Sequence, residues 1–307
     1  MEVRNKIKVN TKILSIENLE SSFSKIIFGT MRLSENLGSS ADNLRLLECA
    51  FESGINSFHV SSEYSSYSNF CNLLNSLRNK RNNFKYIVKL PAPHFEDSNF
   101  NVNLIRKRVE KYLTDLKVES LDCLQWLLRS NPINDNTRIK FLQNYKDEFE
   151  EEFKSLKKEG KIKSILSFPY SNNFAKESLE LSYIDGFINY LNLIELDSVE
   201  ILELLNLKST FIAVRPFLAG LFTNKLDDQF NLKEISIRNK IKDSLGVDSI
   251  GLEELALTFP LLHPKVSSLI ISFSSLNHIF NAKRVLMNIE IDKSKFLKTY
   301  YLLKGIQ

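Results

Sequence analysis

The sequence predicts a single (β/α)8 barrel, and three observations favour this fold class. Short apolar segments of strand type alternate eight times with amphipathic segments of helical type. One of the strands, residues 121–128, is almost continuously apolar, as expected for a parallel strand with both faces covered. No Pro/Gly-rich linker divides the 307 residues, and α/β barrels often reach this size as one domain. We therefore expect residues 1–307 to form one domain.

The first part of the chain predicts an addition to the barrel and then its first strand and helix. Two short alternating runs within residues 6–16 indicate an N-terminal β-hairpin. A strand over 25–28 precedes a helix over 41–53, where apolar residues recur at helical spacing. Gly54 follows this helix, at the position of a left-handed helix stop.

The remaining elements follow from the same two periodicities, 2 for strands and 3.6 for helices. Strands are predicted over 55–60, 86–90, 121–128, 162–167, 186–190, 210–214 and 266–272. Helices are predicted over 68–79, 101–116, 145–159, 175–181, 199–205, 251–262 and 276–287. A further helix over 293–303 has no strand after it, so we expect it as a C-terminal addition to the barrel.

Composition excludes several classes of protein. The chain is 43% hydrophobic and 25% charged, which is typical of a soluble globular protein. Its net charge is only +4 and its basic residues are scattered, which argues against binding to nucleic acid. No apolar run approaches the roughly 18 residues of a membrane span. Cys49, Cys71 and Cys123 are odd in number and lie in apolar surroundings, which indicates reduced, buried thiols and a cytoplasmic location.

Common sequence motifs of catalysis and metal binding are missing. Glycine is scarce, and neither GxGxxG nor GxxxxGK[ST] occurs, so no glycine loop is available to hold a phosphate. The four histidines have no metal-ligand spacing, and CxxC, HExxH and GxSxG are missing. We therefore expect no metal centre of these types and no serine-hydrolase nucleophile.

Residues 54–64, Gly-Ile-Asn-Ser-Phe-His-Val-Ser-Ser-Glu-Tyr, resemble a strand of the aldo-keto reductases. In that family the second strand reads Gly-hydrophobic-Asn-x-hydrophobic-Asp-Thr-Ala-x-x-Tyr. The resemblance continues through residues 156–162, 214–221 and 253–275, and so covers nearly the whole chain. It implies NADPH-dependent reduction of an aldehyde, a ketone or a sugar on a barrel of this kind.

The resemblance places Tyr64 at the general acid and Lys89, at the end of the third strand, at the cation that lowers the acid's pKa. A loop tyrosine that caps the barrel and a surface lysine are the structural alternatives. The family's aspartate is replaced by His59. A neutral imidazole there accepts a hydrogen bond, a protonated one repels Lys89, and a purely structural buried histidine is the third interpretation.

The family's carbonyl-orienting histidine falls on the fourth strand, where this sequence departs again. The position belongs to Leu127, or to Arg129 if the strand is two residues longer before its loop. An arginine is able to polarise a carbonyl or to bind a carboxylate through two hydrogen bonds, whereas a leucine does neither.

The resemblance also implies positions that hold the nicotinamide. Where the family's fifth strand presents polar side chains to the carboxamide, this chain has Phe168 and Pro169, which donate no such hydrogen bond. The glutamine position of the sixth strand falls on Ile188, or on Asn189 after a shift of one residue.

The phosphate end of the cofactor is matched only in part. Ser272 replaces a glycine after the eighth strand, and no arginine follows for the adenosine 2′-phosphate. Ser272, Ser274 and Ser275 precede a helix and would form an anion site through hydroxyls and amides, while Ser275 is equally suited to an ordinary N-cap. Arg215 would contact the pyrophosphate or pair with an acidic neighbour.

Two functions from different classes follow. The first is a divergent NADPH-dependent oxidoreductase with Tyr64 as its acid, favoured by the retention of Tyr64 and Lys89. The second is a catalytically inactive barrel with a binding or regulatory role, for which a protein partner is expected. The joint loss of the aspartate, the histidine and the carboxamide donors favours this second function. Because the fold and the general acid persist, we expect the oxidoreductase, with the inactive barrel as the alternative.

Overall fold

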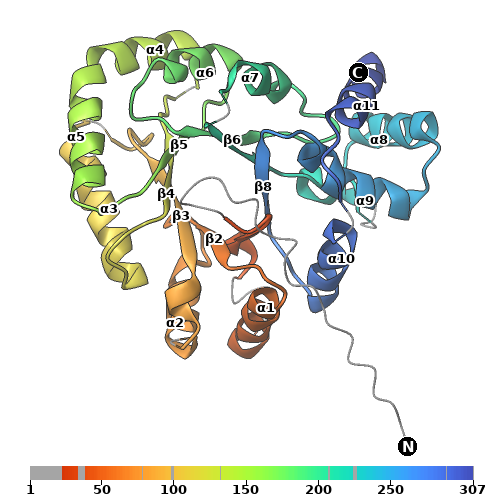
Figure 1. The fold of residues 1–307 in the computed structure, drawn as a ribbon, viewed down its shortest axis with the longest axis horizontal. Helices are drawn as coiled ribbons and strands as arrows, with labels where there is room; N and C mark the ends of the chain where they lie inside the picture. Colours follow the sequence, from red (N-terminus) through yellow and green to blue (C-terminus); the bar gives the residue numbers. More distant parts are fainter. Residues whose placement is uncertain are drawn as a thin grey trace, which may run out of the picture.

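Eight parallel strands close into a barrel in the order in which they follow along the chain, with β1 paired to β8 (Figure 1). The strands are β1 (Ile26–Gly29), β2 (Ser57–Val60), β3 (Lys85–Pro91), β4 (Cys123–Leu127), β5 (Ile165–Ser167), β6 (Gly186–Tyr190), β7 (Thr210–Val214) and β8 (Val266–Ile271). This computed structural model describes residues 23–33, 39–77, 79–97, 100–131, 133–206, 208–223, 227–287 and 289–306. The predicted (β/α)8 TIM barrel is confirmed, while the β-hairpin expected within residues 6–16 lies outside the described residues.

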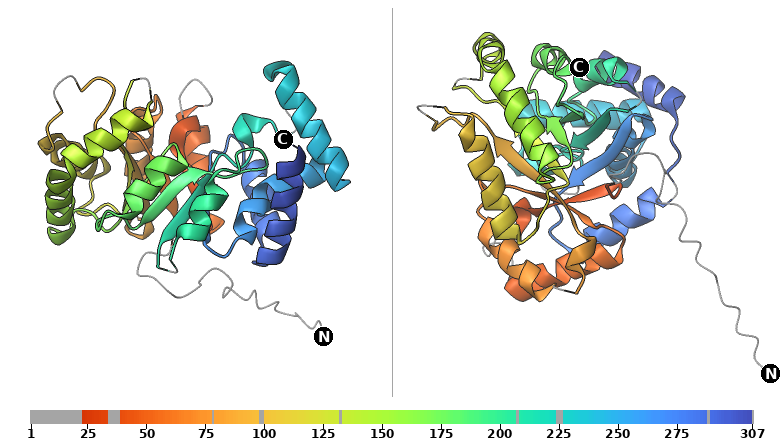
Figure 2. Two further views of the ribbon diagram at one scale, coloured as in Figure 1. Left: turned by 90° about the horizontal axis from the view of Figure 1, so that it is seen from above. Right: turned by 60° about the vertical axis from the view of Figure 1, so that its left-hand side comes forward.

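Helices surround the strands on all sides (Figure 2). They are α1 (Ser40–Glu52), α2 (Tyr67–Ser76), α3 (Asn103–Leu116), α4 (Asp135–Asn144), α5 (Lys146–Lys158), α6 (Asn172–Leu179), α7 (Ser198–Leu204), α8 (Leu232–Leu245), α9 (Ser249–Thr258), α10 (Leu276–Leu286) and α11 (Lys293–Ile306). Ser39 and Asp42 form a capping box at the start of α1, and Gly54 follows its end with φ 89°. The predicted helix stop at Gly54 is thus confirmed.

The strands are apolar on both faces because each face is buried. Inward-facing side chains fill the barrel with an aliphatic cluster. Its members include Ile27, Ile87, Cys123, Leu166, Ile188, Ile212 and Ile270. Outward-facing residues such as Phe28, Phe58 and Trp126 pack between the strands and the helices and are fully buried. Strand alternation therefore decides which side chains reach the mouth of the barrel.

Helices α4 and α8 were not anticipated from the apolar pattern. Each buries few apolar side chains: Leu142 in α4 and Ile241 in α8 are fully buried, while Leu232 of α8 is 85% exposed. Their end signals were nevertheless present in the sequence. Asn231 and Glu234 form a capping box, and Gly246 ends α8 in a left-handed conformation.

Composition also led to expectations about the cysteines and about membrane-spanning segments. None of the three cysteines forms a disulfide bond, and Cys123 is fully buried inside the barrel, whereas Cys49 and Cys71 are only half-buried. Within the described part of the chain, no helix combines the length and apolar character that crossing a bilayer requires.

Candidate active site

A cluster of charged side chains lies beyond the C-terminal ends of β2, β3 and β4, where barrel enzymes carry their active sites. Glu63 lies at its centre. The Glu63 Oε1 atom is 2.5 Å from Nη1 of Arg129 and 3.1 Å from Nε2 of His94. Its Oε2 atom is 2.9 Å from Nζ of Lys89 and 3.2 Å from Nη2 of Arg129. One carboxylate, in the loop after β2, thus joins basic groups from the next two strand–loop units, those of β3 and β4.

Local hydrogen bonds hold this arrangement in place. The Ser61 carbonyl accepts from the backbone N–H of Tyr64, and the Ser61 hydroxyl accepts from that of Glu63, so the loop turns directly after β2. The hydroxyl of Tyr112, on α3, accepts from the backbone N–H of Ser62 and lies 2.9 Å from the Lys89 carbonyl, to which it donates. The loop that presents Glu63 and Tyr64 is therefore tied to the end of β3.

Tyr64 and Lys89 come together, as the resemblance implies. Lys89 belongs to the inward-facing row of β3, and its Nζ lies 5.7 Å from the centroid of the Tyr64 ring. Burial raises the pKa of the Tyr64 phenol, and the negative charge of Glu63 raises it further, while Arg129 opposes them. In this arrangement the phenol is not brought toward neutrality, as a proton donor in a reductase needs to be.

His59 forms a buried polar pair inside the barrel. Its Nε2 lies 2.7 Å from Oε1 of Gln125, and its ring contacts the edge of the Tyr64 ring at 6.2 Å between centroids. Burial lowers the pKa of His59 to about 4, against the hydrogen bond to Gln125 and with help from the charge of Lys89. His59 is therefore neutral near pH 7, and the carboxylate beside Lys89 comes from Glu63 instead.

The buried imidazole predicts a pH dependence of stability. The folded chain keeps His59 neutral down to about pH 4, whereas an exposed histidine binds its proton near pH 6.5. Because the unfolded chain binds the extra proton, stability falls as pH falls through this window, by roughly 2–3 kcal/mol between pH 7 and pH 4.5. Urea unfolding at both pH values measures it. His59→Gln is expected to lose this part of the slope and His278→Gln, on the surface, to keep it; equal slopes in all three proteins would contradict the assignment.

Both candidates for the family's histidine position face the same side of β4. Leu127 is the last residue of the strand and belongs to the inner apolar cluster. Arg129 lies two residues further on, in the loop, where its side chain is 8% exposed. Its Nε donates to the Tyr170 hydroxyl at 3.1 Å, and its guanidinium lies 5.0 Å from the Phe95 ring centroid. Arg129 is thus the polar group of the pair that reaches the charged cluster.

Aromatic side chains lie at the positions where the resemblance implies a nicotinamide. The Phe168 ring packs edge-on against Tyr170 at 4.8 Å and against Tyr190 at 5.1 Å between centroids. Tyr170 adopts a left-handed backbone conformation with φ 62°, which is uncommon outside glycine. Phe168 is 5% exposed, so this group forms a packed layer.

The sixth-strand positions divide between the two faces of the barrel wall. Ile188 points inward with the apolar cluster. Asn189 pairs in register with Ala213, which belongs to the outer cluster, so alternation directs its side chain outward. Arg215 lies over the Tyr190 ring and pairs with Glu195, its Nη1 lying 3.0 Å from Oε1. The acidic neighbour allowed for in the sequence is therefore present.

Two of the serines after β8, Ser274 and Ser275, interact with His278 within the chain. Ser275 is the N-cap of α10, its hydroxyl accepting from the backbone N–H of His278. The Ser274 hydroxyl lies 3.3 Å from Nδ1 of the same histidine. Ser272 lies close to Gly29 on β1, where a Cβ atom would be only 2.6 Å from the Ser272 hydroxyl. The capping role expected as an alternative for Ser275 is observed.

These positions do not fit a nicotinamide cofactor. Phe168 and Ile188 offer the carboxamide no hydrogen bond, and Asn189 is directed to the other face. Arg215 is already paired with a carboxylate. Among the described residues, no group of three His, Cys, Asp or Glu side chains is placed to hold a metal ion either.

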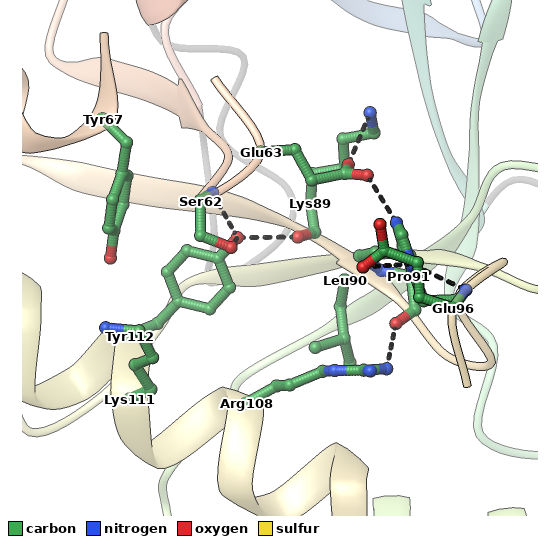
Figure 3. A pocket seen from close by; sticks show the side chains of 11 residues that line it. Ser62, Glu63, Tyr67, Lys89, Leu90, Pro91, Glu96, Arg108, Lys111 and Tyr112 are labelled. Atoms are coloured by element: carbon green, nitrogen blue, oxygen red, sulfur yellow. Dashed lines mark hydrogen bonds and ion pairs between the residues drawn. The ribbon is translucent and has the colours of Figure 1, made fainter. Parts of the chain in front are cut away.

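A pocket opens beside the cluster, between the end of β3 and α3 (Figure 3). It has a volume of about 190 Å³. Figure 3 shows Lys89 extending to Glu63 on one side and the Tyr112 hydroxyl bound to Ser62 and to the backbone of Lys89 on another. The charged cluster is therefore reached from solvent through a polar pocket lined by Ser62, Glu63, Lys89, His94 and Tyr112.

Fold and site together define an α/β barrel with a polar, tyrosine- and lysine-bearing mouth. The sequence matches the Aldo/keto reductase family over residues 25–299, and the chain belongs to this family. Its members in general carry out carbonyl reduction with NAD(P)H. No curated protein matches the sequence.

Solved structures share the fold at low identity. Aldo-keto reductase AKR11C1 from Bacillus halodurans, in its holo form, is similar with a TM-score of 0.72 and 18% identity, over 91% of this chain and 92% of that one. The glycerol dehydrogenase AKR11B4 from Gluconobacter oxydans has a TM-score of 0.69 and 19% identity, over 95% of each chain. At such identities the similarity establishes the fold.

Sequence reasoning missed Glu63, His94 and Tyr170. A signal for Glu63 existed, because it is the one acidic residue in the loop between β2 and α2 and directly precedes Tyr64. With the family's aspartate replaced by His59, Lys89 needed another carboxylate, and this loop was the nearest source. For His94 and Tyr170 the sequence carried no comparable signal.

Proposed function

We propose that this chain is a barrel of the Aldo/keto reductase family that binds a small ligand at its mouth without reducing a carbonyl through NADPH. The observation that carries the proposal is Phe168, packed between Tyr170 and Tyr190 where a nicotinamide carboxamide needs hydrogen-bond donors. A binding role also leaves room for a protein partner, which stays a prediction.

The charges around Tyr64 support the same conclusion. A phenol becomes an effective acid when a neighbouring cation lowers its pKa. Here the Lys89 cation is paired at 2.9 Å with Glu63, whose negative charge raises the pKa of Tyr64. The retained tyrosine and lysine therefore serve the charged cluster rather than proton donation.

Titration of NADPH into the purified protein tests the proposal. We expect no detectable binding at NADPH concentrations up to about 1 mM. The chain keeps only a few of the polar contacts that would hold the cofactor, and so few contacts leave the Kd at about a millimolar or weaker. Quenching of the single tryptophan, Trp126, and calorimetry would be followed together, with NADH as a second ligand. Micromolar binding of NADPH would overturn the proposal.

A second candidate is NADPH-dependent reduction of an aldehyde, a ketone or a sugar, which family membership favours in general. The specific observation in its favour is that Tyr64, Lys89 and a carboxylate, Glu63, meet at one end of the barrel. In that function Tyr64 would give its proton to the carbonyl oxygen. If NADPH binds, carbonyl reduction that disappears in Tyr64→Phe while binding persists would establish this candidate in place of the first.

A further inference from the structure

The Glu63 carboxylate occupies a site that basic side chains from two other strand–loop units build. Arg129 contacts both of its oxygens, while Lys89 and His94 contact one each. The fork of an arginine on both oxygens is the usual mode by which proteins bind a free carboxylate. Glu63 thus holds the place that an external carboxylate would take.

Exposure shows which member of the cluster is able to leave. The side chain of Arg129 is 8% exposed, and those of His94 and Lys89 are 19% and 20% exposed. Glu63 is the most exposed member at 28%, and it lies on a loop rather than on a strand. It also lines the pocket of Figure 3 together with Lys89 and His94, so a ligand entering that pocket meets these three side chains directly. Arg129 does not line the pocket and becomes accessible to the ligand when Glu63 moves away from it.

The charge balance of the cluster favours a further anion. Lys89 and Arg129 are two cations, and among the described residues Glu63 is the carboxylate that pairs with both. The other cations of the pocket have partners of their own: Arg108 pairs with Asp97, and Lys111 with Asp115. Since unpaired cations of low exposure are costly, Glu63 is able to move away only if another anion replaces it.

Glu96 does not change this balance. Its Oε2 lies 3.7 Å from Nδ1 of His94, and its side chain is 89% exposed. It therefore stands in solvent at the rim of the pocket, where a charge has little influence on a ligand held against Arg129.

We propose that Lys89, Arg129 and His94 bind a small organic carboxylate, which displaces the carboxylate of Glu63. This inference rests on the proposed binding function and names its ligand class. A carboxylate suits the site better than a phosphate because the occupant observed is a planar, two-oxygen group held by the Arg129 fork.

Calorimetric titration of the full chain with pyruvate and phenylpyruvate tests the inference, with methyl pyruvate as the uncharged control. We expect Glu63→Gln to bind the acids about tenfold more tightly than the wild type, because the competing charge is removed. Arg129→Gln is expected to bind them at least about tenfold more weakly than the wild type, for the loss of charged hydrogen bonds. Lys111→Gln removes a cation from the same pocket and should change affinity less than about twofold.

Several results would contradict the inference. These are equal affinity in Glu63→Gln, Arg129→Gln and the wild type, tighter binding of inorganic phosphate than of the acids, or no binding to Glu63→Gln. Arg129→Lys, which keeps the charge but loses the fork, serves if Arg129→Gln does not fold, and should bind more weakly than the wild type.

NADPH titrated in parallel separates this inference from the proposed function. Without binding of either ligand class the inference fails and the proposed function stands, whereas NADPH binding overturns that function and leaves the acid titration to decide the inference.

Discussion

Gly186→Ala is expected to destabilise the barrel by about 3–5 kcal/mol, through backbone strain and overpacking together. Gly186 begins β6 with φ 151°, and a Cβ atom there would lie 1.9 Å from the carbonyl oxygen of Thr210 on β7. The contact is with backbone on the neighbouring strand, so no side-chain rotation relieves it. Urea unfolding followed by the fluorescence of Trp126 measures the loss.

Gly246→Ala is the matched control for this variant. Gly246 also has a positive φ, 62°, but nothing lies within 4 Å of an added Cβ atom. The cost there is the left-handed backbone alone, about 1–2 kcal/mol. Similar losses in the two variants would show that the approach of Thr210 is not what requires glycine at position 186.

Arg138→Met is expected to cost about 3–5 kcal/mol of stability, since it removes a buried cation with several partners. The side chain of Arg138, on α4, is fully buried. Its guanidinium donates to the carbonyls of Leu128 at 2.9 Å and Pro169 at 2.5 Å, and pairs with Asp135 at 3.0 Å. Methionine keeps the apolar stem but leaves both carbonyls without this donor. The difference in unfolding free energy from the wild type measures the effect.

Arg106→Met provides the comparison for a well-paired but accessible arginine. Arg106 contacts Glu152, Glu159 and Ser155, yet its side chain is 27% exposed. Because water replaces its partners, we expect a cost of about 1 kcal/mol or less. If Arg138→Met lost no more unfolding free energy than Arg106→Met, burial would not explain the contribution of Arg138 to stability.

The fold was predictable from sequence because both periodicities were strong. The bounds of β6 and β7 agree with the predicted 186–190 and 210–214, since apolar residues are framed there by glycine or by polar residues. Helix α4 escaped prediction for an equally physical reason. It buries a charged residue, Arg138, where a pattern search expects an apolar one.

The site was predictable only in its strand-borne part. The backbone of a barrel fixes the direction of strand side chains, so the inward direction of Lys89 followed from its position on β3. Tyr64 lies in the loop after β2, and its place next to Lys89 was implied by the family resemblance. The direction of a loop side chain depends on packing by several other elements. The contacts of Glu63 with Arg129 and of Arg129 with Tyr170 could therefore not be predicted from the sequence alone.

The contact between β1 and the end of β8 has a consequence for how this barrel changes over evolution. In the rotamer observed, the hydroxyl of Ser272 fits because residue 29 has no Cβ atom. Side chains at positions 29 and 272 therefore compete for the same space where β1 meets the end of β8, the seam of the barrel. A larger residue at either position is acceptable only while the other residue stays small. In sequences descended from the same ancestor, a side chain at position 29 should be accompanied by glycine at position 272. Such paired exchange would mark the seam as a unit of covariation.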